Sequence, residues 1–273
     1  MIYQEIEPIK PLAKFIKCFW ILESKKENPS YLKKDTLLPD GFTELIFHYS
    51  ERFKEFERDN TYTLQPKSFV YGQRESYIEI QPSGDVGIIG VRFYPGGCSP
   101  FLKFPICELI NQAVNLEEIF GTKGRYFEDK IINSKDNKTR LEIIQNTLLQ
   151  ELFDPKKFDF LMDDFVNKII RANGTYSIEK FSNESKISVR QIRRRFLSAI
   201  GIGPKRFSKI MRFQKTLRLI KFGQNNTLTS LIHNSNYFDQ SHFIRDFKNL
   251  AGSPPKEFLA KTHKFNDFMM KNG

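Results

Sequence analysis

The sequence predicts an α+β protein, in which an N-terminal antiparallel β-barrel or sandwich with appended helices precedes an all-α domain. Three observations predict this class. Short aromatic and β-branched runs between turn residues fill residues 1–105. A helical spacing of apolar residues replaces them over residues 106–172. Within residues 173–273, a 14-residue segment occurs twice. We therefore place the boundary between an N-terminal domain and a C-terminal helical domain at residue 172.

Three runs define the predicted β part, at residues 14–22, 43–49 and 86–94. Turn residues rich in Pro, Gly and Asp precede or follow these runs. No helical pattern intervenes, which favours antiparallel strands.

Two amphipathic helices are predicted next, at 141–152 and 158–169, because apolar residues recur there at every third or fourth position. Asp154-Pro155 predicts the N-cap and first position of the second helix. Either stripe could pack on the barrel or on a second subunit, and we expect at least one to pack within the chain. Asn173-Gly174 predicts the end of the second helix.

The positive charge of the chain is concentrated at its C-terminal end. The formal net charge is +11. Residues 171–273 hold 20 Lys and Arg against 6 Asp and Glu, whereas residues 1–170 hold 23 against 26. A basic domain beside a nearly neutral one predicts a polyanionic partner for the basic part.

The repeat lies in this basic part. Residues 194–207 align with residues 245–258 at an offset of 51, and six of the 14 positions are identical. Repetition on this scale indicates one structural unit used twice.

Each copy predicts two short helices joined by a tight turn. Ser188 and Gln191 predict a capping box for the second helix of the first copy, which Gly201 ends. Asp239 and Gly252 bound the corresponding helix of the second copy. The outward residues are basic or polar: Arg190, Arg193 and Arg194 in the first copy, and Ser241, His242, Arg245 and Lys248 in the second. Such helices fit the DNA major groove, where Arg pairs with guanine.

Residues 204–223 predict a helix that links the two copies. About 16 helical residues span roughly 24 Å. With the radii of the two units added, a separation of roughly 34 Å, about one turn of DNA, becomes feasible.

These residues resemble the AraC/XylS family of bacterial transcription regulators. The resemblance rests on the stretch Ser188–Phe196, Gly201 with Pro204, Arg212, and the stretch Tyr237–Lys248 with Gly252-Ser-Pro254. It implies that one monomer places two helices in successive major grooves. Arg190, Arg193 and Arg194 would read the first site, and Ser241, His242 and Arg245 the second. Gln240, Lys248 and Arg212 would face phosphates or be structural.

The chain departs from this family at three positions. Lys186 stands where the first turn usually has Gly, and Ser182 and Ile232 stand where the first helices usually have Ala. A non-glycine residue with positive φ costs on the order of 1 kcal/mol.

The front half is similar to the N-terminal domain of an uncharacterised subset of these regulators, through residues 38–46 and 90–97. The similarity implies a small cupin-like barrel that senses an effector or pairs subunits. Trp20, His48 and Arg92 are candidates to line an effector pocket, although each residue type is more often found in a core or at a rim. A front half that only dimerises is the alternative.

The family resemblance implies double-stranded DNA and RNA polymerase as partners, a small-molecule effector or a homodimer, and a cytoplasmic location. Activation of transcription is expected, although the sequence itself leaves the sign of regulation open. No apolar run reaches the roughly 18 residues of a membrane span, so no membrane partner is expected.

The alternative function is an enzyme, such as a DNA-repair protein, fused to the same DNA-binding domain. It would need an activated cysteine. Cys18, Cys98 and Cys107 are scattered among apolar residues, and none of the four His is at metal-ligand spacing with another ligand. We therefore expect no catalytic residue, metal or cofactor.

Overall fold

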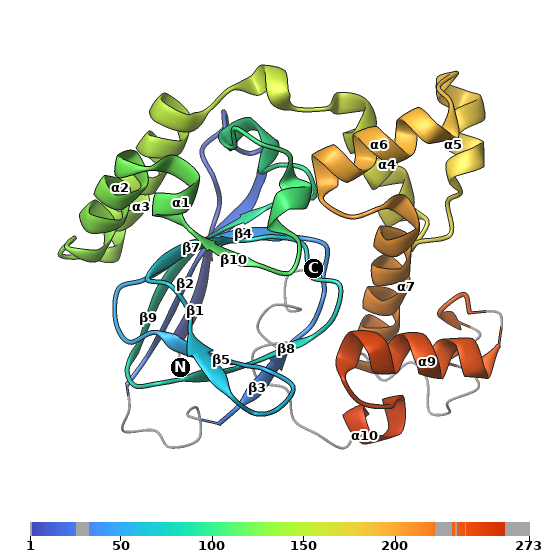
Figure 1. Cartoon of the computed structure of the whole chain (residues 1–273), viewed down its shortest axis with the longest axis horizontal. Helices are drawn as coiled ribbons and strands as arrows, with labels where there is room; N and C mark the ends of the chain where they lie inside the picture. Colours follow the sequence, from blue (N-terminus) through green and yellow to red (C-terminus); the bar gives the residue numbers. More distant parts are fainter. Residues whose placement is uncertain (1, 26–32, 222–230, 233, 238, 260–273) are drawn as a thin grey trace.

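The computed structural model describes residues 2–25, 33–221, 231–232, 234–237 and 239–259. Figure 1 shows two sheets with the helices of residues 116–147 on one side and the helices of residues 160–221 and 240–259 on the other. A long connection between residues 147 and 160 crosses from one side to the other.

The three predicted strands lie next to one another in a six-stranded sheet. They are β2 (Ile16–Ser24), β9 (Val86–Phe93) and β4 (Thr43–His48), and every pairing in this sheet is antiparallel. The sheet order is β1-β2-β9-β4-β7-β10, with β1 (Ile2–Ile6), β7 (Ser68–Tyr71) and β10 (Ala113–Asn115) completing it.

A second antiparallel sheet faces part of the first. Its order is β3-β8-β5-β6, from β3 (Asp35–Leu37), β8 (Ile78–Pro82), β5 (Phe53–Phe56) and β6 (Tyr62–Leu64). The predicted antiparallel class is confirmed. The two sheets remain separate among the described residues, so the arrangement is a sandwich of open sheets and not a closed barrel.

A small core joins the two sheets. Trp20, Leu22 and Ile88 of the large sheet pack with Phe53 and Ile80 of the small one. Gly90 lies opposite Trp20 across β2 and β9, and a Cβ there would lie 2.3 Å from the indole ring. The missing side chain therefore makes room for the tryptophan.

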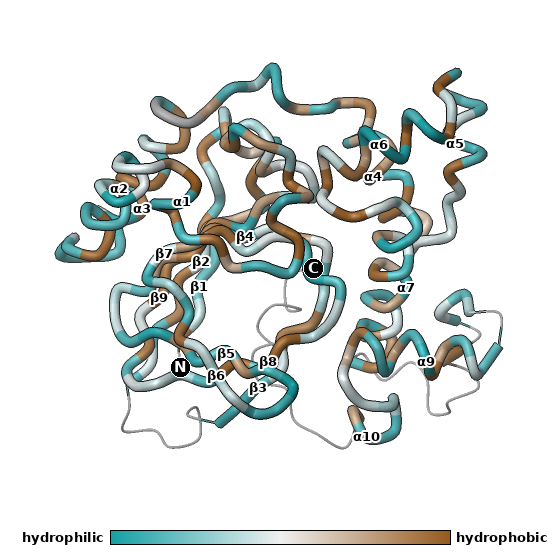
Figure 2. Tube along the Cα trace, in the orientation of Figure 1, coloured by the Kyte–Doolittle hydropathy of each residue, from teal (hydrophilic) through white to brown (hydrophobic). Residues whose placement is uncertain are grey.

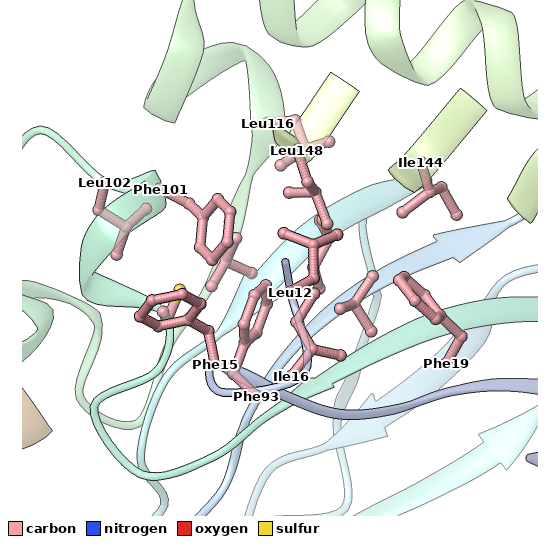
Figure 3. Close-up of a cluster of buried hydrophobic side chains, with 14 of the residues drawn as sticks. Leu12, Phe15, Ile16, Phe19, Phe93, Phe101, Leu102, Leu116, Ile144 and Leu148 are labelled. Carbon is pink, nitrogen blue, oxygen red and sulfur yellow. The ribbon is translucent and has the colours of Figure 1, made fainter. Parts of the chain in front are cut away.

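Helices cover the other face of the large sheet. They are α1 (Leu116–Phe120), α2 (Thr122–Ile132), α3 (Asn137–Thr147) and the wider turn η4 (Leu148–Leu152). Figure 3 shows Ile144 and Leu148 above Phe19 and Phe93 of the strands. The first predicted stripe thus packs within the chain, and the side chain of Leu152 lies outside the described residues.

The second predicted helix starts later than expected. Asp154 caps only the short turn η5 (Pro155–Lys157), after which Phe158 is extended. Asp159 caps α4 (Phe160–Arg171) instead. The predicted stripe is therefore divided between two cores: Phe158 packs in the core of Figure 3, while Phe165 and Ile169 pack with the C-terminal helices.

The C-terminal part consists of helices around a core rich in phenylalanine. They are α5 (Ile178–Ser185), α6 (Val189–Ile200), α7 (Pro204–Lys221), α9 (Gln240–Ala251) and α10 (Pro255–Leu259). In Figure 1, α6 and α9 lie at opposite ends of α7. The strands at the centre of the large sheet are mostly hydrophobic along their length, whereas these helices alternate (Figure 2). Amphipathic helices of this kind bury one face and expose the other.

The two parts of the chain touch through α7. Leu38 packs in the core of the C-terminal helices. The amide of Gln214 donates to the carbonyl of Pro39 at 2.7 Å, and Arg206 Nε lies 3.3 Å from a carboxylate oxygen of Glu75. Gly41 has a φ of 86°, and a Cβ there would lie 2.8 Å from Met211. The loop between β3 and β4 is thus seated on the linker helix.

Further contacts reach the residue that follows each repeated helix. A Cβ on Gly201 would lie 3.1 Å from Ile106 of the short turn η3 (Ile106–Leu109). A Cβ on Gly252 would lie 2.5 Å from the ring of Tyr77. The N-terminal part therefore contacts both copies of the repeat at equivalent glycines.

Candidate nucleic-acid interface

The repeat in the sequence is a repeat in the structure. The helices α6 and α9 each have 12 residues, and their first and last residues are 51 positions apart. Gly201 and Gly252 follow them with φ of 99° and 81°, and Pro204 and Pro255 begin the next helices. We call α6 and α9 the two outward helices.

The first unit has the predicted caps and an unusual turn. Ser188 and Gln191 form the capping box, and Ser177 caps α5. Lys186 adopts the left-handed conformation at a φ of 59°, so a lysine occupies a position that favours glycine. The hydroxyl of Ser182 donates to the carbonyl of Ile187 at 2.7 Å, which ties the first helix to the residue after the turn. Two of the three departures from the family pattern thus meet at this turn.

The second unit follows the same plan. Asp239 caps α9 by accepting from the backbone N–H of His242 at 2.7 Å. Asn236 makes the turn with a φ of 60°. Leu231, Ile232 and Asn234 are helical, while residues 222–230, which precede them, lie outside the described residues. Ile232 is half-buried against the C-terminal core.

Three arginines share the exposed side of α6. Arg190, Arg193 and Arg194 are exposed, while Ile192 and Phe196 are fully buried. None of the three arginines forms an ion pair with another described residue.

The exposed side of α9 carries Gln240, Ser241, Arg245 and Lys248. Its buried side carries Phe243, Phe247 and Leu250. Within the part of the chain that the structure describes, Arg245 and Lys248 also have no ion-pair partner. Both outward helices therefore present cations that no other described residue pairs.

His242 is placed differently from the other predicted residues. Its Nε2 lies 3.1 Å from Oδ2 of Asp246, one helical turn further along, and its side chain is 35% exposed. Its ring meets the ring of Tyr237 edge-on, with centroids 5.6 Å apart. Packing and an ion-pair partner therefore position this imidazole before any ligand arrives.

Several other basic side chains of this domain serve the structure. Arg195 donates two hydrogen bonds to Asp159, at 2.8 and 2.6 Å. Arg212 donates to the carbonyl of Gly174 at 2.8 Å, which fits the structural alternative for this residue. Further ties are Lys209 to Asp246, Arg206 to Glu75, and Arg218 to Asn173.

Sequence reasoning missed the roles of Arg195 and Asp246. The signal was present, because these residues align in the repeat and carry opposite charges. Asp246 is 1% exposed and interacts with both Lys209 and His242. A carboxylate buried in a basic helix needs such partners.

The three N-terminal candidates do not line one pocket. Trp20 and His48 line a cavity of about 50 Å³ between the two sheets. Arg92 lines another of about 170 Å³ between the sheets and α7. Leu37 and Arg74 line both.

Arg92 is held by acidic neighbours. It forms ion pairs with Asp40 and, at 3.6 Å, with Glu44, and its side chain is buried. Burial acts to lower the pKa of Arg92, but the carboxylates of Asp40 and Glu44 outweigh burial and raise it. This guanidinium is already neutralised by the protein.

The cysteines have the properties of core residues. Burial raises the pKa of the Cys18 thiol to about 12 and also raises that of Cys98. Protonated thiols are poor nucleophiles, so neither environment activates a cysteine. Within the described ranges, no three His, Cys, Asp or Glu side chains are grouped as metal ligands would be. No described helix combines the length and apolar character needed to cross a membrane.

Two family models match separate parts of the chain. Residues 181–261 match the model of a helix-turn-helix domain. Residues 4–115 match a domain of unknown function, DUF6597. No curated protein matches the sequence.

Solved structures include similar chains. ToxT from Vibrio cholerae is 10% identical, with 95% of this chain and 98% of that chain covered and a TM-score of 0.46. A probable AraC family transcriptional regulator from Rhodopseudomonas palustris is 26% identical over 37% of this chain and 96% of its own, with a TM-score of 0.35. A DNA-binding transcriptional dual regulator from Escherichia coli is 20% identical over 37% and 97%, with a TM-score of 0.32.

The repeated units, their caps and the match over residues 181–261 agree with one another. The chain therefore has a C-terminal helix-turn-helix domain, and its residues 4–115 match a domain of unknown function.

Proposed function

We propose that this protein is a sequence-specific, DNA-binding regulator of transcription. One observation carries the proposal: the basic side chains on the exposed sides of α6 and α9 have no ion-pair partner among the described residues, whereas Arg195, Arg206 and Lys209 each have one. Unpaired cations on two helices of one chain suit the two strands of phosphates along a DNA duplex.

The length of the linker helix α7 supports binding to two adjacent sites on DNA. With 18 residues, α7 is about 27 Å long. The outward helices lie at its two ends, and successive major grooves on one face of DNA are about 34 Å apart. We assign Arg190, Arg193 and Arg194 to bases of the first site, and Ser241, His242 and Arg245 to the second. Gln240 and Lys248 contact phosphates in this assignment.

The test uses the full-length protein. Selection from random DNA and pull-down of genomic fragments would define a preferred site, and competition with bulk DNA at physiological salt would measure the preference. We expect a bipartite site with two halves about one turn apart. A protein that selects no sequence over bulk DNA contradicts the proposal.

Substitution of Arg190, Arg193 and Arg194 together by Ala is expected to abolish the preference for one half-site only. The matched control replaces three exposed lysines of the N-terminal part, Lys103, Lys123 and Lys130, by Ala. Equal losses in the two variants would mean that charge alone, and not the position of α6, accounts for binding.

We further propose that the N-terminal domain binds a small-molecule effector. The cavity that Trp20 and His48 line supports this part, since it lies inside the sandwich and is mostly apolar. Arg92 does not line that cavity, so we assign it a structural role beside it. A homodimer, a contact with RNA polymerase, activation as the sign of regulation and a cytoplasmic location remain predictions of the family resemblance.

A further inference from the structure

Three residues that line the cavity between the two sheets have a buried polar atom without a hydrogen-bond partner among the described residues, namely Nε1 of Trp20, Oε1 of Glu44 and Nδ1 of His48. His48 is 2% exposed, and its Nδ1 makes no hydrogen bond with any described residue. Its ring lies between Phe53 and Phe69, with centroid distances of 5.4 and 5.9 Å. A buried acceptor left unsatisfied costs about 1–3 kcal/mol, so its presence calls for a ligand or a structural reason.

A chain of hydrogen bonds fixes which nitrogen of His48 carries the proton. Tyr71 donates its hydroxyl proton to Glu55 at 2.8 Å, and the amide nitrogen of Gln65 donates to the other oxygen of Glu55, also at 2.8 Å. A carboxylate only accepts hydrogen bonds, so the Gln65 amide must turn its nitrogen towards Glu55. Its oxygen is then the atom 3.2 Å from Nε2 of His48.

The consequence reaches the cavity. Because the oxygen of Gln65 can only accept, Nε2 of His48 must donate and therefore carries the proton. Burial lowers the pKa of His48 to about 4, which keeps the ring neutral near pH 7. A neutral imidazole with its proton on Nε2 has a lone pair on Nδ1. The cavity thus contains a hydrogen-bond acceptor, Nδ1 of His48. Glu55, two hydrogen bonds away through Gln65, determines that this nitrogen is the unprotonated one.

The charges around the cavity compensate one another. Glu44 and Arg74 both line it. Burial raises the pKa of Glu44, while the nearby Arg92 and Arg74 favour its ionised form. The Glu44 carboxylate would repel a negatively charged ligand, and the Arg74 guanidinium would repel a positively charged one. Most of the remaining wall is apolar, from residues such as Trp20, Leu22, Ile46, Phe53 and Ile80.

We propose that this cavity binds an uncharged, mainly apolar molecule with one hydrogen-bond donor, of the phenol or alcohol class, and that Nδ1 of His48 accepts that donor. The inference deepens the effector part of the proposed function and rests on it only for the effect on DNA binding. Glu55 and Gln65 are positioning residues in this scheme, because they act on the ligand through the tautomer of His48.

The tautomer can be measured without any substitution. Long-range ¹H–¹⁵N correlation spectra of the ¹⁵N-labelled full-length protein distinguish the protonated from the unprotonated ring nitrogen of each of the four histidines. We expect His48 to show a protonated Nε2 and an unprotonated Nδ1 at pH 7. In Glu55→Gln, the Gln65 amide can turn over, and we expect Nδ1 to become protonated in part of the molecules. A wild-type His48 with its proton on Nδ1 overturns the proposal.

Ligand preference is tested with three matched probes, namely 4-methylphenol, 4-fluorotoluene and 4-methylbenzoate. Trp20 is the single tryptophan of the chain and lines the cavity, so its fluorescence reports binding at this place. We expect the phenol to bind about fivefold to tenfold more tightly than its fluoro analogue, which is the effect of one hydrogen bond of about 1 kcal/mol. The benzoate is expected to bind least.

Two variants separate the hydrogen bond from the apolar contact. His48→Phe is expected to make the phenol and the fluoro analogue bind equally. Phe53→Leu, the control on the apolar wall, is expected to weaken both probes by the same factor. Tight binding of the benzoate, equal binding of phenol and fluoro analogue to the wild type, or no binding of any probe each overturns the proposal. If no probe binds, Nδ1 of His48 accepts a hydrogen bond only from a buried water.

The experiment also separates this inference from the effector function. If 4-methylphenol binds with the expected preference but the affinity of the protein for its DNA site is unchanged, the cavity assignment holds and regulation through this cavity fails. If the tautomer and the preference are wrong while another molecule alters DNA binding, the effector function holds and the ligand class fails.

Discussion

Arg195 and Asp246 occupy the same position in α6 and α9, carry opposite charges, and are each ion-paired with a residue outside their own helix. Arg195 pairs with Asp159 at the start of α4, and Asp246 pairs with Lys209 of α7 at 2.8 Å. The two copies of the unit thus use one position to attach the outward helix, each to a different neighbour. The seventh residue of each helix fixes its orientation relative to the rest of the domain.

The Asp246 attachment predicts a stability effect. Asp246→Ala leaves Lys209, which is 22% exposed, without its partner, and is expected to destabilise the protein by about 2 kcal/mol. Urea unfolding followed by circular dichroism measures the change. Lys248→Ala on the exposed side of the same helix is the control and should stay within about 0.5 kcal/mol of the wild type. Equal stability of the two variants would show that the Lys209 contact contributes little.

Base reading predicts position-specific losses. Arg194→Ala and Arg245→Ala are each expected to weaken binding to the selected site by roughly 1–3 kcal/mol and to relax base choice at different half-sites. Selection with each variant, followed by competition between wild-type and altered half-sites, measures the change. Unaltered discrimination in Arg245→Ala would mean that α9 does not read bases through this residue.

Phosphate contact predicts a different pattern for Lys248. Because this contact carries no sequence information, Lys248→Ala should weaken binding to specific and unrelated DNA alike. The slope of log affinity against log salt concentration should flatten by about one unit. Fluorescence anisotropy over a series of salt concentrations gives the slope. A loss confined to the selected site would instead indicate that Lys248 contacts a base.

The buried His48 predicts a loss of stability in acid. Its pKa is lowered to about 4 in the folded protein, below the value of about 6.5 expected when unfolded. The unfolded chain therefore binds the proton more readily, so the contribution of this group is complete above about pH 6.5 and is lost as the pH falls towards 4. The shift corresponds to about 3 kcal/mol at most.

Urea unfolding at a series of pH values tests this, with the wild type compared with His48→Phe. The difference in stability between the two proteins should change between about pH 6.5 and 4 and be constant above that range. His242→Gln, with its partly exposed ring, is the control. A pH profile of His48→Phe that runs parallel to the wild type would contradict the assigned pKa.

The sequence predicted those features whose cause is local. Caps at Ser188 and Asp239, glycines with positive φ and the three central strands follow from residues close together in the chain. The start of α4 did not follow, because both Asp154 and Asp159 can cap a helix and the chain between them is extended at Phe158 to fill a core formed by distant residues. Periodicity alone joined Phe158 to Phe165, although they pack in different cores.

The exposure of the candidate binding residues was predictable to the same degree. Exposure of Arg190, Arg193 and Arg194 follows from the helical period, and the structure agrees. The pairing of His242 with Asp246 follows from their spacing of one helical turn. The pairing of Asp246 with Lys209 depends instead on how α7 crosses α9. Arg92 was grouped with Trp20 and His48 by residue type, but only the positions of Asp40 and Glu44 decide that its charge is already neutralised.

At Gly201 and Gly252, the N-terminal part of the chain contacts both halves of the DNA-binding domain. Ile106 and Tyr77 lie against these two positions, so residues outside the domain contact the end of each outward helix. A C-terminal domain fused to a different N-terminal domain would lose these two contacts. Chimeric regulators built from this chain should therefore keep the segment from Gln73 to Leu109 together with its own helices.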